Sequence, residues 1–296
     1  MALSALHSLM FGLAAATLQL AAIASIDAQS PRLTAAELVA RISERSGVRL
    51  SESTVDTFKA GRPDTPVTGI AVTMMATLDV LQRSAARGHN LIITHEPTFY
   101  GHRDATDVLE REGDAVYSAK LSFIREHGLV VWRFHDTPHT MKPDMIRAGM
   151  IRALSLEPYQ NAKNPDVFDI VPTTLEALAR RVGRKLGANA VRTIGDPKAR
   201  VSRLGMTQGF PGFGRNRSVL QAEGIDVLIM GEDHEWETIE YAADAITARQ
   251  MQGVIVLGHI PSEQAGMEEV ARWLGTFIKD VPIEMVHARD PFRPLR

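Results

Sequence analysis

Histidines and carboxylates gather directly after apolar segments of the sequence. Residues 91–97 read LIITHEP, so an apolar run ends in His95 and Glu96. Residues 254–263 read VIVLGHIPSE, where His259 and Glu263 follow a second apolar run. Imidazole nitrogens and carboxylate oxygens are good ligands for divalent ions of borderline or hard character. The residue types and their spacing therefore indicate metal chemistry.

A third apolar run, residues 129–134, is followed within one turn by His135, Asp136 and His139. Asp136 could bind a metal itself, or it could orient an imidazole that does. The alternative for this segment is an Asp-Thr-Pro turn with solvent-facing histidines. Taken singly, each of the three groups also fits a structural role, such as a helix cap or a hydrogen bond to a backbone carbonyl.

The placement of these groups along the chain is correlated. Ligands of open α/β sheets bind beyond the carboxyl ends of strands, and structural histidines have no reason to concentrate there. We therefore expect one shared metal site. Five of the ten histidines lie at or just after the end of an apolar run: His95, His102, His135, His139 and His259.

Two further segments could serve the same site. GEDHEWE (231–237) places Glu232, His234 and Glu235 after another apolar run, where they could contact the substrate, the metal or its ligands. An acidic helix N-terminus explains them equally well. QGFPGFG (208–214) could wrap a phosphate with backbone N–H groups, although a tight turn is the simpler explanation. Three basic residues near the expected site could meet an anionic substrate: Arg103, Arg133 and Lys142.

Strands alternate with helices along the chain, which predicts an α/β fold with covered, parallel sheets. Thr34-x-x-Glu37 is a capping box that opens a helix to about Arg45. We expect strands at 69–74, 90–94, 129–134, 201–209, 225–231, 253–258 and 281–286. We expect further helices at 78–88, 174–187, 235–250 and 262–278.

The two halves of the chain repeat one plan, because an apolar strand, His, one residue and Pro occur at both 90–97 and 253–261. We therefore expect an internal duplication: a first lobe over 31–154 and a second over 201–296, facing each other across the metal site. Residues 155–200 would connect them, and the last strand, 281–286, would close the second sheet.

Composition excludes several classes of protein. The chain has 296 residues, a net charge of −2 and no cysteine. A charge this close to zero gives no electrostatic footprint for nucleic acid. Without cysteine there are no disulfides, no zinc–thiolate sites and no cysteine nucleophile. Metal binding must therefore use His, Asp and Glu.

The N-terminal segment differs from the rest of the chain. No residue from Leu9 to Ile26 is charged, which predicts a secretory signal over residues 1–30 with cleavage after Ala24 or Ala28. Export to the periplasm follows from this interpretation. The alternatives are an uncleaved anchor or a simple tail on a cytoplasmic protein. Nothing later in the sequence is long and apolar enough to span a bilayer.

The order of these motifs resembles the Nif-three-like family, also known as the GTP cyclohydrolase 1 type 2 family. The resemblance covers about residues 33–290. It rests on TFKAG (57–61), LIITHEP, the His-containing turn after VVWRF, MTQGFPG (206–212), DVLIMGE (226–232) and GHIPSE (258–263). It implies two related α/β lobes facing each other across a dinuclear metal centre, and assembly into a ring-shaped homohexamer.

The resemblance also implies a ligand set: His95, Glu96, His139, His259 and Glu263. Members of the family usually have His-His-Pro where this chain has His95-Glu96-Pro97. They usually have His-Thr-Asn-x-Asp where this chain has His135-Asp136-Thr137-Pro138-His139, so that His139 stands at the position of the usual Asp. The two departures keep three histidines and two carboxylates, so we interpret them as compensating. In the alternative, Asp136 replaces His139 as a ligand.

These expectations converge on a metal-dependent hydrolase with one or two divalent ions per chain. The ion could be Zn, Fe, Mn or Mg. By resemblance the substrate could be a nucleotide such as GTP. If the chain is exported, another phosphoester or a cyclic amide fits better. The competing hypothesis is a non-catalytic metal-binding scaffold or partner protein.

Overall fold

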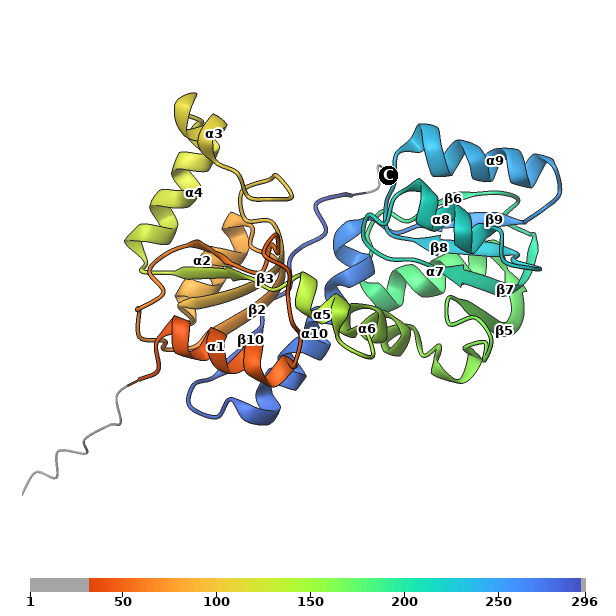
Figure 1. Cartoon of the computed structure of the whole chain (residues 1–296). Helices are drawn as coiled ribbons and strands as arrows, with labels where there is room; N and C mark the ends of the chain where they lie inside the picture. Colours follow the sequence, from red (N-terminus) through yellow and green to blue (C-terminus); the bar gives the residue numbers. More distant parts are fainter. Residues whose placement is uncertain (1–31, 294–296) are drawn as a thin grey trace, which may run out of the picture. The chain divides into compact units, whose positions relative to one another are not determined.

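Two five-stranded sheets form the framework of the protein, shown as a computed structural model in Figure 1. The structure describes residues 32–293. The predicted secretory signal over 1–30 lies outside this range. No helix in the described range is long and apolar enough to cross a membrane. The predicted α/β fold is confirmed.

The first sheet has the order β1-β4-β3-β2-β10. Its strands β2, β3, β4 and β10 run parallel, and β1 is an antiparallel edge. The capping box predicted at Thr34 and Glu37 is present at the start of α1. The bounds are β1 (Phe58–Ala60), β2 (Ile70–Met75), β3 (Leu91–Glu96), β4 (Val130–Arg133) and β10 (Ile283–Met285), with α1 (Ala35–Ser46), α2 (Leu78–Ala86), α3 (Asp107–Arg111) and α4 (Ala115–Glu126).

The second sheet has the order β5-β7-β8-β9-β6, in which β7, β8 and β9 are parallel and both edges are antiparallel. The expected helix at 235–250 begins as a π-helical turn, η2, before α9. The bounds are β5 (Val167–Thr174), β6 (Arg192–Ile194), β7 (Arg200–Met206), β8 (Val227–Met230) and β9 (Gly253–Val256), with η1 (Glu157–Tyr159), α7 (Leu175–Leu186), α8 (Phe213–Leu220), η2 (Glu235–Ile239) and α9 (Glu240–Thr247).

Each sheet is packed by a helix that follows a strand of the other sheet in the chain, so that two helices are exchanged between the sheets. After β4 the chain forms α5 (Asp136–Thr140) and α6 (Met145–Leu154), and then enters β5 of the second sheet. Met150 and Leu154 of α6 pack in the core of that second sheet. After β9 the chain forms α10 (His259–Phe277), whose Met267 and Leu274 pack in the core of the first sheet.

This exchange corrects the prediction for the last strand. Residues 281–286 were expected to close the second sheet, but β10 pairs with β2 in the first. The physical reason is α10, because its apolar face is buried against the first sheet and carries the following strand there. The segment 155–200, expected as a connection, contributes β5, α7 and β6, and both strands belong to the second sheet.

The exchanged helices cross in close contact. A Cβ atom at Gly149 of α6 would overlap the backbone of Ala265 in α10, and one at Gly266 would overlap the backbone of Ile146 in α6. Figure 1 shows α6 and α10 between the two sheets. Glycine at both positions allows the two backbones to approach closely, so the crossing fixes one half of the fold against the other.

Candidate metal centre

The end of β3 supplies two buried side chains of the site, since His95 is 0% and Glu96 7% exposed. His95 Nδ1 lies 3.2 Å from the carbonyl oxygen of Phe134, which accepts its hydrogen bond. His95 Nε2 is buried and has no hydrogen-bond partner among the described residues. A buried nitrogen without a partner is costly, and a metal ion would satisfy it.

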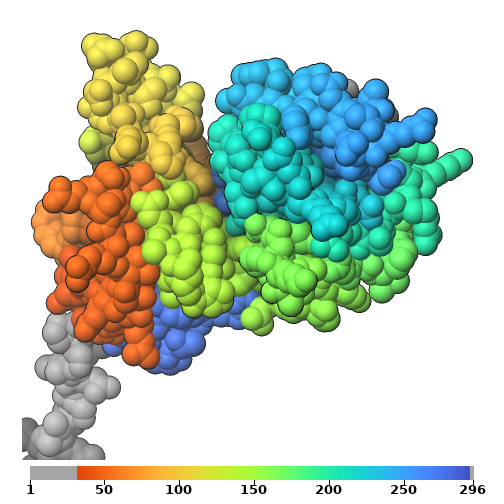
Figure 2. All heavy atoms as spheres, turned by 45° about the vertical axis from the view of Figure 1, so that its right-hand side comes forward, coloured from red at the N-terminus to blue at the C-terminus, as the bar shows by residue number. Residues whose placement is uncertain are grey.

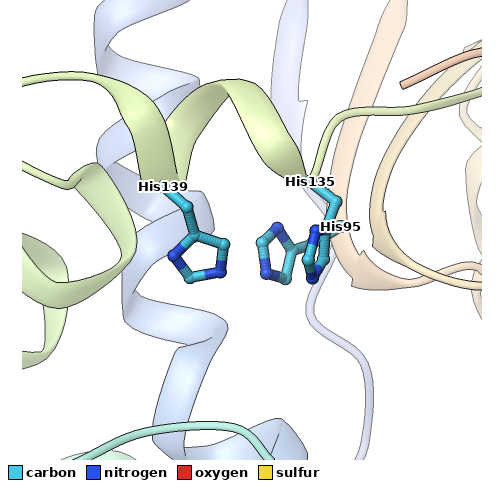
Figure 3. A group of neighbouring side chains, drawn as sticks. All are labelled: His95, His135 and His139. Carbon is cyan, nitrogen blue, oxygen red and sulfur yellow. The ribbon is translucent and has the colours of Figure 1, made fainter. Parts of the chain in front are cut away.

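Helix α5 carries His135 and His139 toward His95, as Figure 3 shows. Asp56 holds the start of this helix: its carboxylate accepts hydrogen bonds from the backbone N–H groups of residues 135, 136 and 137 and from the Thr137 hydroxyl. The ring centroids of His95 and His135 are 4.6 Å apart, and those of His135 and His139 are 5.1 Å apart. Three imidazoles therefore converge on one point.

Helix α10 supplies the remaining ligands. The sequence predicted this helix from about residue 262, but it begins at His259 because Gly258 turns the chain with φ 88°. Pro261 is compatible with this start, since the first turn of a helix needs no internal N–H donor. His259 and Glu263 thus lie one turn apart on one helix face. His259 Nε2 is 3.1 Å from Glu263 and 3.2 Å from Glu96.

The glycine-rich turn at 208–214 packs on this ligand helix. The Gly209 N–H donates to the Ser262 hydroxyl. A Cβ at Gly209 would overlap the carboxylate of Glu263, and φ is +59°. Glycine is required here for both reasons. The turn therefore supports Glu263, which is only 4% exposed.

The four histidines of the site, His95, His135, His139 and His259, share one hydrogen-bond pattern. Each Nδ1 faces an oxygen, and each Nε2 remains available to bind a metal ion. The Nδ1 partners are Phe134 O for His95, Asp136 for His135, Asp144 for His139 and Glu232 for His259. Metal-binding histidines in proteins almost always have such a partner on the second nitrogen. Ligand atoms of His95, His135 and His139, and those of His95, Glu96 and Glu263, lie within 4.8 Å of one another. The donor set fits a divalent ion.

Arg133 at the end of β4 is fully buried behind Glu96. Its guanidinium is 3.2 Å from Glu96 Oε2 and donates to the carbonyl oxygens of His95 and His102. The sequence left Arg133 open as a group that could meet an anionic substrate, but its donors are directed to these partners. Glu96 Oε2 is thus engaged, which leaves Oε1 to face His135 and His259.

The charges around the ligands shift their pKa values in different directions. Burial would raise the pKa of Glu96, but the hydrogen bond from His259 and the neighbouring imidazoles lower it to about 2. Burial, reinforced by His95, lowers the pKa of His135 to about 4. Burial would also lower the pKa of His259, but three carboxylates around it raise that pKa to about 12.

A cavity of about 400 Å³ opens onto the ligands. Glu96, His135, His139, His259 and Glu263 form part of its wall, and the other lining residues include His102, Arg147, Gln208, Phe210 and Arg215. Figure 2 shows the hollow between the yellow segment around residue 110 and the teal segment around α8. A small molecule in this cavity would contact the ligand side chains directly.

The model of the Duf34/NIF3 (NGG1p interacting factor 3) family matches residues 36–291. The chain belongs to this family. The match covers both sheets and every residue of the site, so the resemblance inferred from the motifs is confirmed. Among curated proteins, none matches the chain.

Solved structures of NIF3-like proteins share the fold. The Bacillus cereus protein related to NIF3 has a TM-score of 0.70 at 13% identity, over 90% of this chain and 100% of that one. The protein ybgI, described as of unknown function, has a TM-score of 0.69 at 20% identity over 88% and 100%. The Staphylococcus aureus hypothetical protein SA1388 has a TM-score of 0.68 at 16% identity over 89% and 100%. At these identities the likeness concerns the fold.

The structure of this NIF3 family member brings together the five residues expected as ligands, and it adds His135 to them. Asp136 turns away: one carboxylate oxygen accepts from the Thr54 hydroxyl and the Val55 N–H, and the other faces His135. Glu232 contacts His259. Glu235 does not reach the site and forms an exposed ion pair with Arg192.

Sequence reasoning missed Asp56 and Asp144, which hold the histidine-bearing helix and His139. Asp144 carried a recognisable signal, since Asp before an apolar helix is a typical N-cap, and its side chain does accept from the Arg147 N–H. The same carboxylate's contact with His139 had no sequence signal. A further group, Asp233, His234 and Glu237, has a local role, because Asp233 accepts from Asn216 and Thr238.

Proposed function

We propose that the protein is a hydrolase that depends on divalent metal ions bound between the two halves of the fold. The observation that carries the proposal is the shared orientation of four histidines. An oxygen holds each Nδ1, and the Nε2 atoms of His95, His135 and His259 face the buried carboxylates of Glu96 or Glu263. His139 lies in one group with His95 and His135. Such an arrangement is organised for a metal before the metal arrives.

The six side chains would be the ligands: His95, Glu96, His135, His139, His259 and Glu263. These side chains form two groups, His95 with His135 and His139, and His95 with Glu96 and Glu263, so the set favours two ions per chain over one. When bound, such ions supply Lewis acidity and activate water for hydrolysis. Glu96 and Glu263 stay ionised, since the surrounding imidazoles lower both pKa values against the effect of burial.

His102 is the group placed to move a proton. It lines the cavity, and its ring lies 5.7 Å from that of His135. It is not among the six proposed ligands, and we propose it as the general acid or base that acts on a bound substrate. Its backbone carbonyl is held by Arg133, which fixes the chain at this position. GTP, another phosphoester or a cyclic amide would be the substrate.

A metal-binding scaffold without turnover is the second candidate. It is favoured by the deep burial of His95, Glu96 and Glu263, which suits retention of an ion as well as catalysis. A ring-shaped homohexamer and export of the chain are proposals of the same kind. Native mass spectrometry would test the first, and sequencing of the mature N-terminus would test the second.

Metal analysis of the purified protein tests the site. We expect about one to two ions per chain, and fewer than about half an ion after His95→Ala or Glu263→Ala. His127→Ala is the matched control, because His127 is an exposed histidine whose Nδ1 also faces a carbonyl. Equal metal content in all four proteins would show that the site is elsewhere.

Hydrolysis assays then separate the two candidates. The purified protein, the chelated protein and the chelated protein with metal restored are tested on GTP, simple phosphoesters and cyclic amides. Turnover that is lost and restored with the metal supports the hydrolase. Full metal content without turnover on any of these classes supports the scaffold.

A further inference from the structure

Two arginines lie on the wall of the same cavity, apart from the metal ligands. Arg147 comes from α6 and Arg215 from α8. Asp166 holds both: one carboxylate oxygen is 3.1 Å from Arg147 and the other is 2.7 Å from Arg215. Two guanidinium groups share this one carboxylate, while Asp144, the aspartate that lines the cavity, is paired with His139.

The two arginines differ in what they can still bind. Arg147 is largely buried and also donates to the carbonyl oxygens of Met206 and Pro165, so it serves the fold. The side chain of Arg215 is 46% exposed. Its guanidinium has no other hydrogen bond or ion pair within residues 32–293. Asp166 orients it and leaves most of its donors available.

A planar guanidinium held in this way binds oxyanions well, because its N–H groups match two oxygens of a phosphate or a carboxylate. Gln208 and Phe210 line the cavity beside the arginines' part of the wall. Gln208 adds amide donors, and Phe210, which is half exposed, adds an apolar face. The site is therefore suited to an anionic group attached to an apolar or planar one.

We propose that Arg215 binds an oxyanionic group, a phosphate or a carboxylate, of the small molecule that occupies this cavity. The rest of that molecule would extend to the metal-binding side chains. As a statement about the substrate, this rests on the proposed hydrolase. Anion binding by Arg215 does not depend on the proposed hydrolase, because Arg215 is oriented by Asp166 and not by any of the six proposed metal ligands.

Equilibrium dialysis of inorganic phosphate against the full chain tests the proposal, first as purified and then after chelation of metal. We expect saturable binding in both forms, and weakening on the order of tenfold in Arg215→Gln, as expected for loss of a charge-assisted hydrogen bond. Arg217→Gln is the matched control: it lies in the same helix, is exposed and does not line the cavity. Arg215→Lys, which keeps the charge and loses the fork, should bind with intermediate affinity.

Two results would overturn the proposal: no saturable phosphate binding by the wild-type chain, or affinities of Arg215→Gln and Arg217→Gln within about twofold of each other. Repeating the experiment with acetate distinguishes a phosphate site from a carboxylate site. Arg215-dependent anion binding by a protein that hydrolyses nothing would leave the anion site standing and refute the hydrolase. Metal-dependent hydrolysis with no effect of Arg215→Gln on anion binding would support the hydrolase and refute the anion site.

Discussion

His135 and His259 occupy corresponding places in the two sheets, although the sequence repeat paired His259 with His95, and their pKa values shift in opposite directions. Each follows a parallel strand, β4 or β9, that is flanked by an antiparallel edge strand and leads into an exchanged helix. Burial lowers the pKa of His135 to about 4. The pKa of His259 is raised to about 12 despite burial.

The neighbours of the two rings explain the difference. His135 lies among other imidazoles, since His95 and His139 are within 5.1 Å between centroids, and a second positive charge there is unfavourable. His259 faces the carboxylates of Glu96, Glu232 and Glu263. The duplicated topology therefore sets the position of each histidine, while the charges around the ring set its pKa.

The largest effect is expected from Arg133→Met, which tests whether the stability of the first half depends on its buried guanidinium. The variant would leave Glu96 Oε2 and the carbonyl oxygens of His95 and His102 without their buried donor, so we expect a loss of about 3–5 kcal/mol in the free energy of unfolding. Urea unfolding measures it. Arg62→Met is the control: its exposed ion pair with Asp64 should be worth no more than about 1 kcal/mol. Equal losses would contradict the assigned role of Arg133.

Gly266→Ala tests the crossing of the exchanged helices. The added Cβ would overlap Ile146 of α6, so we expect about 1–3 kcal/mol of destabilisation from overpacking. Gly275→Ala in the same helix meets no atom within 4 Å and should be neutral or stabilising by up to about 1 kcal/mol. Thermal unfolding of the pair measures the difference. A stabilised Gly266→Ala would refute the close contact.

Asp56→Ala tests the carboxylate that holds the start of α5; the start of α10 has no such side-chain cap. Loss of the carboxylate that holds the start of α5 should cost about 1–2 kcal/mol of stability and weaken metal affinity on the order of tenfold. Competition with a metal-binding dye measures the affinity. Asp64→Ala, which removes an exposed carboxylate paired with Arg62, is the control. Unchanged metal affinity in Asp56→Ala would show that α5 holds its histidines without this residue.

The smallest effect concerns protons in the metal-free protein. The raised pKa of His259 means that its stabilising contribution is present below pH 6.5 and is lost as pH rises toward about 12. The lowered pKa of His135 means that its contribution is present above pH 6.5 and is lost as pH falls toward about 4. At neutral pH, metal binding should therefore release a proton from His259 and none from His135.

Calorimetry of metal binding in buffers of different ionisation enthalpy counts these protons. His259→Asn should reduce the release by about one proton, and His135→Asn should leave it unchanged. Equal reductions in the two variants would show that the two histidines do not differ in protonation.

Much of the site could be read from the sequence because its ligands follow recognisable apolar runs. The capping box at Thr34, the strand before His95 and the strand before His259 are local patterns, and the structure has them. The sequence predicted the start of α10 at about residue 262, three residues after its start at His259, since the turn at Gly258 was not anticipated. The role of Asp56 could not be read, since its hydrogen bonds reach residues about 80 positions away.

The sequence by itself determined the α/β fold, the family and the strand ends that bear His95, His135 and His259, because alternating polarity and short motifs depend on neighbouring residues alone. Only the tertiary structure decided which sheet receives β10, how α6 and α10 cross, and which side of each imidazole faces the site. These depend on burial and on hydrogen bonds between distant segments. The opposite pKa shifts of His135 and His259 have the same origin, because they follow from the carboxylates and imidazoles that folding places around each ring.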